Sequence, residues 1–136
     1  MFCTCFEERM KLVLLILLAF TGVTSVSCGV MMALEPTGSL LLLDLHWLQH
    51  TSFENFSMPG LILIIVGAVH LFAWYHVKTS RKNGLWWAVA AGVLIIGYEA
   101  VQMLLLQMTY WLQYSYMAIG FFTILMALQL KHKELI

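Results

Sequence analysis

Residues 58–77 read MPGLILIIVGAVHLFAWYHV, a largely apolar stretch of the length that an α-helix needs to cross a bilayer. Stretches of the same kind occupy residues 11–34, 85–108 and 112–130. A helix rises ~1.5 Å per residue, so about 20 residues cross a hydrocarbon core ~30 Å thick. The sequence therefore predicts an all-α fold, a four-helix transmembrane bundle that forms a single integral membrane domain over residues 1–136.

The composition favours lipid as the solvent of this chain. Hydrophobic residues make up 62% of the sequence and charged residues 10%, and the mean hydropathy is +0.88. A soluble domain has about 25% charged residues. The formal net charge is zero, so nothing in the charge favours nucleic acid as a partner. The partner that the composition predicts is the lipid bilayer.

All seven Lys and Arg residues fall on one side of the predicted bundle. They precede the first span, lie between the second and third spans, or follow the fourth span. The two opposite connections, residues 35–57 and 109–111, contain none. Because basic residues of short loops stay in the cytoplasm, we expect both termini and residues 79–84 to be cytoplasmic.

The longest connection, residues 35–57, has two features of its own. The sequence EPTGS at residues 35–39 predicts a turn, because Pro36 fixes φ and Gly38 permits a left-handed conformation. Residues 40–48 are apolar but too few to span a bilayer. We therefore expect a short helix there, lying along the outer interface between the first and second spans.

The N-terminal region leaves more than one interpretation open. Met10, followed by Lys and an apolar run, is typical of a bacterial start, so Met1 is a second candidate start upstream of it. Residues 25–28 faintly resemble a lipoprotein cleavage site, but the apolar run continues beyond them, as in a retained span. Cys3 and Cys5 lie close to the membrane, where acylation is a further alternative.

Glu99 is the acidic residue inside the third span, roughly 20 Å from its cytoplasmic end and so in the outer half of the bilayer. A carboxylate in lipid costs at least a few kcal/mol unless it is partnered, so we expect Glu99 to face the bundle interior. Ala88, Gly92, Ile95 and Gln102 recur on the same helical face.

Polar residues of the other spans reach similar depths. Ser25 and Tyr116 lie level with Glu99, and His70 lies about 9 Å nearer the cytoplasm, at the level of Thr123. Small and hydroxyl residues also make ordinary contacts between membrane helices, so a packing role stays open for each of them. We predict an intramembrane polar site formed by Glu99, Gln102, Ser25, Cys28, Tyr116 and His70.

The sequence predicts no catalytic residue and no cofactor. It contains no phosphate-binding glycine loop, no nucleophile elbow and no paired-cysteine motif, and Cys28 lacks the second thiol that dithiol chemistry needs. His46 and His50 have the i, i+4 spacing of two metal ligands, with Glu54 one turn further. Such a pair arises readily by chance, and we expect no metal.

Three short segments resemble a group of small bacterial four-span proteins. They are EPTGS at residues 35–39, TSFENF at residues 51–56 leading into PGL at residues 59–61, and Glu99 with Gln102. The architecture is similar to that of the DoxX-like four-helix membrane proteins. This resemblance implies a bundle in a bacterial inner membrane and carries over no catalytic residue.

These features favour one function over two alternatives. We expect a non-enzymatic accessory or assembly subunit that packs against a second copy or a partner membrane protein. The first alternative is a proton-linked small-molecule permease element that uses Glu99. The second is a membrane redox or quinone-handling protein.

Overall fold

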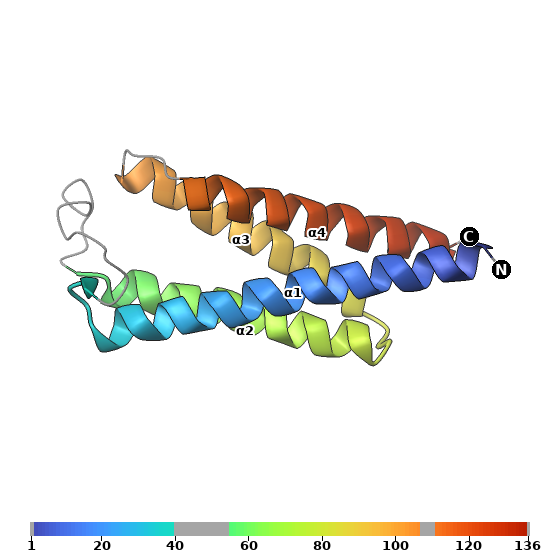
Figure 1. The fold of residues 1–136 in the computed structure, drawn as a ribbon, viewed down its shortest axis with the longest axis horizontal. Helices are drawn as coiled ribbons and strands as arrows, with labels where there is room; N and C mark the ends of the chain where they lie inside the picture. Colours follow the sequence, from blue (N-terminus) through green and yellow to red (C-terminus); the bar gives the residue numbers. More distant parts are fainter. Residues whose placement is uncertain (1, 40–54, 107–110, 136) are drawn as a thin grey trace.

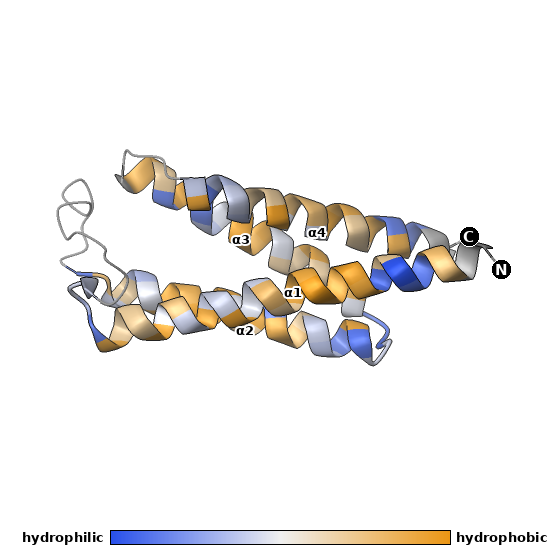
Figure 2. Cartoon of the chain, viewed as in Figure 1, coloured by the Kyte–Doolittle hydropathy of each residue, from blue (hydrophilic) through white to orange (hydrophobic). Residues whose placement is uncertain are grey.

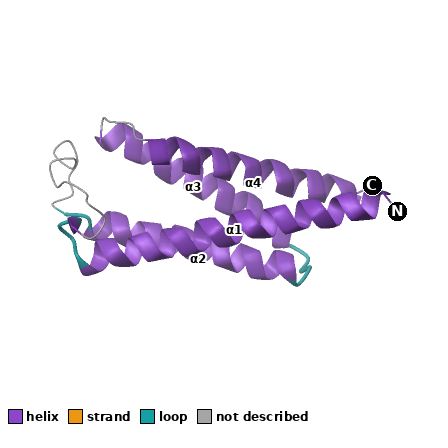
Figure 3. Ribbon diagram, viewed as in Figure 1, coloured by secondary structure: helices purple, strands orange, loops and turns teal. Residues whose placement is uncertain are grey.

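The computed structural model describes residues 2–39, 55–106 and 111–135, and this part of the chain contains four helices and no strand (Figure 3). All four helices are long and apolar enough to cross a membrane. The predicted all-α, four-helix architecture is confirmed. The helices are α1 (Phe2–Leu34), α2 (Ser57–Lys78), α3 (Gly84–Leu106) and α4 (Trp111–Leu135).

The helices α1 and α4 extend beyond the predicted spans. α1 begins at Phe2, whereas its apolar stretch begins at Lys11, and α4 continues to Leu135 rather than ending near Leu130. Hydropathy predicts only the part of a helix that lies in lipid. The backbone hydrogen bonds of the helix continue beyond that part into the polar region. The predicted interfacial helix at residues 40–48 lies outside the described residues.

The turn after α1 has the conformation that its sequence predicts. Gly38 has a φ of 80°, in the left-handed region that glycine adopts without strain. Its N–H donates to the carbonyl of Glu35 over 3.0 Å, and the N–H of Phe56 donates to the carbonyl of Pro36 over 2.9 Å. The second bond joins the two ends of the α1–α2 connection, so α1 and α2 are tied together at the end of the bundle away from the termini.

The turn between α2 and α3 closes with a Schellman motif. Ser80 has a φ of 54°, its N–H donates to Val77 over 3.1 Å, and the N–H of Arg81 donates to His76 over 2.9 Å. The ammonium of Lys11 donates to the Ser80 hydroxyl over 2.7 Å. This turn therefore lies beside the first part of α1, at the end of the bundle where both termini lie (Figure 1).

Glycines bring α1 and α2 together at two levels. A Cβ on Gly29 would lie 2.6 Å from the carbonyl oxygen of Gly60, and a Cβ on Gly67 would lie 2.9 Å from that of Gly22. The two glycines of each helix are seven residues apart, which places them on one face. Any larger side chain would force the helices apart, so these glycines set the α1–α2 separation.

The helices α3 and α4 approach in the same way. A Cβ on Gly92 would lie 2.8 Å from the carbonyl oxygen of Gly120. The bundle is thus two glycine-packed pairs, α1 with α2 and α3 with α4. Figure 1 shows these pairs close together near the termini and diverging toward the opposite end.

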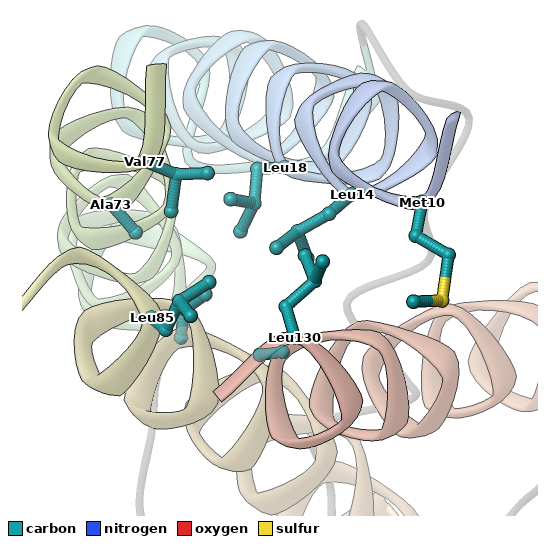
Figure 4. Close-up of a cluster of buried hydrophobic side chains, with 10 residues drawn as sticks. Met10, Leu14, Leu18, Ala73, Val77, Leu85 and Leu130 are labelled. Atoms are coloured by element: carbon teal, nitrogen blue, oxygen red, sulfur yellow. The ribbon is translucent and has the colours of Figure 1, made fainter. Parts of the chain in front are cut away.

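The hydrophobic core lies at the end of the bundle that carries the termini. It combines side chains from all four helices (Figure 4). Leu14, Leu18, Ala88 and Ala91 in this core are fully buried. Hydrophilic residues gather on the outer turns of the helices and in the connections, while the middle of each helix is mainly apolar (Figure 2). The core residues are Met10, Leu14, Leu18, Ala73, Val77, Leu85, Ala88, Ala91, Ala127 and Leu130.

Candidate functional site

Beyond this core, toward the opposite end, the bundle interior becomes polar. Three of the predicted site residues are buried there: Ser25 is 2% exposed, His70 1% and Glu99 6%. Cys28, Gln102 and Tyr116 are half-buried. The other buried polar side chains in the described part of the chain are Thr21, Gln113 and Thr123.

A hydrogen bond across the bundle joins the two helix pairs at this level. The phenol of Tyr116 on α4 donates to the hydroxyl oxygen of Thr24 on α1 over 2.9 Å. The Thr24 hydroxyl donates in turn to the carbonyl of Phe20, one turn earlier on α1, over 2.7 Å. These bonds therefore link α4 to α1 at the level of Thr24.

Tyr116 on α4 lies level with Glu99 on α3. Gly120, one turn after Tyr116, packs against Ile95 and Ile96, which lie about one turn before Glu99. Ser25 follows Thr24 directly on α1 and is buried. The helix α4 thus contacts both α1 and α3 at this level, and the six-residue polar site stays a prediction.

The Glu99 carboxyl has no Lys or Arg beside it. All seven Lys and Arg residues of the chain lie in residues 9–11, 78–82 and 131–133, at the end of the bundle with the termini. A carboxyl that is removed from water without a cation nearby is the kind of group that takes up and releases protons in membrane proteins.

Gln102 lies further along α3, toward its C-terminal end. The side-chain amide of Gln113 on α4 donates to the Gln102 carbonyl oxygen over 3.1 Å. The phenol of Tyr98 donates to the backbone carbonyl of Pro59 on α2 over 3.3 Å. These bonds link α3 to both of its neighbours, so Gln102 acts as a contact between helices.

His70 lies on α2, nearer the hydrophobic core. Its Nδ1 is 2.8 Å from the carbonyl oxygen of Val66. Because a carbonyl oxygen only accepts, Nδ1 carries the proton in this bond, and in the neutral ring Nε2 is left as an acceptor. Nε2 is buried and has no hydrogen-bond partner among the described residues.

Sequence reasoning missed three residues that the structure adds to this region. Thr24 precedes Cys28 by four residues and so shares its helical face, a signal that was present in the spacing. Gln113 stands near the start of α4 as a counterpart to Gln102 near the end of α3. The contact of Tyr98 could not be predicted from the sequence, because its phenol bonds a backbone carbonyl, which any residue could supply.

The prediction of no metal stays a prediction. Within the described ranges, no three His, Cys, Asp or Glu side chains come together as a metal site requires. His46 and His50 lie outside the described residues. The chemical groups assembled at the candidate site are a carboxyl, an imidazole, hydroxyls, phenols and a single thiol, which together suit hydrogen bonding and proton exchange.

No protein-family model, curated protein or solved structure matches this chain. The resemblance to DoxX-like proteins therefore stays a prediction. The four apolar helices define the class: this is a small multi-pass membrane protein.

Proposed function

We propose that the chain is a non-enzymatic accessory or assembly subunit that binds a partner membrane protein through α3. The observation that supports this is the position of Gly97. A Cβ on Gly97 would meet nothing within 4 Å among the described residues. Gly97 is therefore a helix glycine that no other helix in the described part of the chain covers.

The other glycines inside the helices show what glycine does in this protein. A Cβ on Gly22, Gly29, Gly60, Gly67, Gly92 or Gly120 would lie within 3 Å of a neighbouring helix. Glycine costs about 1 kcal/mol relative to alanine inside a helix, and here close packing offsets that cost. Gly97 lacks such packing within the described bundle, and a partner helix would supply it.

The surface around Gly97 fits an apolar helix. Val93 and Val101, one turn to either side, are 56% and 53% exposed. This α3 face, defined as Val93, Gly97 and Val101, is smooth and uncharged, and its glycine lets a second backbone approach closely. The occupant is a transmembrane helix of a partner protein. A second copy of this chain is the alternative that the experiment distinguishes.

The test is chemical cross-linking in native membranes with the Gly97→Leu variant. A leucine side chain on this face holds a partner helix away, and a loss of about 1.4 kcal/mol lowers association roughly tenfold. Ala118→Leu is the matched control, because Ala118 is an exposed small residue on α4. We expect Gly97→Leu to lose the cross-linked product and Ala118→Leu to keep it.

The mass of the product identifies the occupant. A product of twice the chain mass indicates a second copy, and another mass indicates a partner protein. If the unchanged chain forms no product, or if both variants keep it, the proposal is wrong.

The orientation that we propose places both termini in the cytoplasm. Three basic side chains at that end lie over aromatic rings: Lys78 over Trp74 at 4.8 Å, and Arg81 over Tyr75 and Lys131 over Trp86, each at 5.9 Å. Aromatic rings with basic neighbours are typical of a membrane interface, and basic residues favour the cytoplasmic side. This grouping supports the proposed orientation in a bacterial inner membrane.

A second candidate function is a proton-linked permease element that uses Glu99. It is favoured by the burial of a carboxyl in a span with no Lys or Arg at its level. The hydrophobic core lies between Glu99 and the end with the termini. A permease would have to open that core during transport, whereas an accessory subunit would keep it closed.

A further inference from the structure

Two hydroxyl groups inside the bundle lack a hydrogen bond. Thr21 is fully buried and Ser25 is 2% exposed, and neither side-chain oxygen has a partner in the described part of the protein. Burying a hydroxyl without a partner is unfavourable, and most buried polar atoms in proteins are bonded to protein or to ordered water.

Other hydroxyl residues in these helices show the usual alternative. Thr24, Thr79, Ser115 and Thr123 each donate to the carbonyl four residues earlier, over 2.7, 2.8, 3.0 and 2.8 Å respectively. Burial does not prevent this bond, because Thr123 is only 1% exposed. Thr21 and Ser25 do not make it, so their hydroxyls are free to bond a group that lies between the helices.

The unpartnered Nε2 of His70 belongs to the same interior region. A Cβ on Gly22 would lie 2.8 Å from Cδ2 of Leu71, so α1 and α2 touch at these two residues. Thr21 and His70 directly precede Gly22 and Leu71, and both are buried. Thr21 and His70 are therefore at the same level of the bundle, with Ser25 one turn further along α1.

We propose that a chain of buried water molecules fills this interior, from Ser25 past Thr21 to Nε2 of His70. Side chains at i and i+4 on a helix are about 5–6 Å apart, a separation that one water molecule bridges with two hydrogen bonds of about 2.8 Å. Water both donates and accepts, so it satisfies an acceptor nitrogen and two hydroxyls at once. Buried water typically makes about three such bonds.

The two ends of the water chain follow from the packing around it. At its outer end lie Ser25 and the neighbouring Thr24, which Tyr116 bonds. Glu99 lies level with Tyr116, because Gly120 packs against Ile95 and Ile96 one turn away on these two helices. At its inner end the fully buried Leu18 of the hydrophobic core lies one turn before Thr21 on α1. The water therefore connects the level of Glu99 with His70 and stops there. This site does not depend on the proposed function as a subunit.

Radiolytic hydroxyl-radical labelling of the full chain in lipid nanodiscs tests the water chain, because radicals form from water in contact with a side chain. In the unchanged protein we expect His70 to be oxidised and Leu14 to remain unmodified, although both are buried. Thr21→Val keeps the shape of the side chain and removes its hydroxyl. We expect it to abolish the oxidation of His70.

Thr123→Val is the matched control. Its hydroxyl is equally buried but bonded to its own helix, so its loss should leave the oxidation of His70 unchanged. Ser25→Ala repeats the test if Thr21→Val does not fold. The proposal is overturned if His70 is unmodified in the unchanged protein, or if removing the hydroxyl at residue 21 or 25 leaves its oxidation at the original level. Neither result bears on the cross-linking through Gly97.

Discussion

Glu99 is the charged residue of α3. Substitutions there test separately how the shape and the charge of its side chain affect folding. Glutamine has nearly the same shape without a titrating group, so we expect Glu99→Gln to fold with a change in stability within about 1 kcal/mol. A lysine at this depth costs about 2.5–3.5 kcal/mol on insertion, so Glu99→Lys should give little folded protein. The measurement is the yield of monodisperse protein together with its thermal unfolding in detergent.

Glu8→Lys is the control for this pair, because Glu8 is exposed in the first turns of α1 and outside the apolar stretch. It should leave the yield unchanged. The Glu99→Gln variant also separates the two candidate functions. A proton-linked permease element with this substitution no longer takes up its small-molecule substrate. An accessory subunit with this substitution still forms its cross-linked product. Equal yields of Glu99→Gln and Glu99→Lys would contradict the buried position of this residue.

At the same scale, contacts between helices were hard to predict. Counting residues predicts that Ser25 and Tyr116 lie level with Glu99. It did not predict that Tyr116 bonds Thr24 rather than Ser25. Which of two adjacent residues meets a neighbour depends on the rotation of the helix. In lipid both faces of a helix are apolar, so hydrophobic periodicity does not fix that rotation.

At the scale of helices, the glycine contacts define how the pairs form. Gly67→Val places a Cβ 2.6 Å from Cγ2 of Val26 and 2.8 Å from its backbone nitrogen, where the helix itself must move. Overpacking of this kind costs about 1–3 kcal/mol. We expect a clearly lower midpoint of thermal unfolding for Gly67→Val. Gly97→Val is the control, because a Cβ on Gly97 meets nothing within 4 Å among the described residues. Its midpoint of thermal unfolding should be close to that of the unchanged protein. Equal decreases in the two midpoints would refute glycine packing.

The helices themselves were predictable, and their pairing was not. A long apolar stretch has to form a helix in lipid, because every backbone N–H and carbonyl must be bonded within the segment. The tight turn that follows α2 makes α2 and α3 run antiparallel. The closest backbone contacts nevertheless join α1 to α2 and α3 to α4. The seven-residue spacing shared by Gly22 with Gly29 and by Gly60 with Gly67 was the signal for the first of these pairs.

At the scale of the whole molecule, the interior is divided along the bundle axis. The half with the termini holds the hydrophobic core, and the other half holds Ser25, Glu99 and their polar neighbours. A closed apolar core therefore occupies the half of the bundle with the termini, and buried hydrogen-bonding groups occupy the other half. This asymmetry is consistent with a subunit that keeps the membrane sealed.

The basic residues lie at the same end as the core, which leads to a prediction about topology. Lys11 bonds Ser80 in the α2–α3 turn, and Lys131 lies over Trp86 at the start of α3. The N-terminal part of α1, this turn and the end of α4 are therefore on one side of the membrane. Since basic residues favour the cytoplasm, reporter fusions after Ile136 and at Asn83 should read inside, and a fusion at Thr37 should read outside. The structure requires Asn83 and the end of α4 to give the same reading. Opposite readings would contradict the four-span bundle, whereas a reversal of all three readings would keep the bundle and overturn only its orientation.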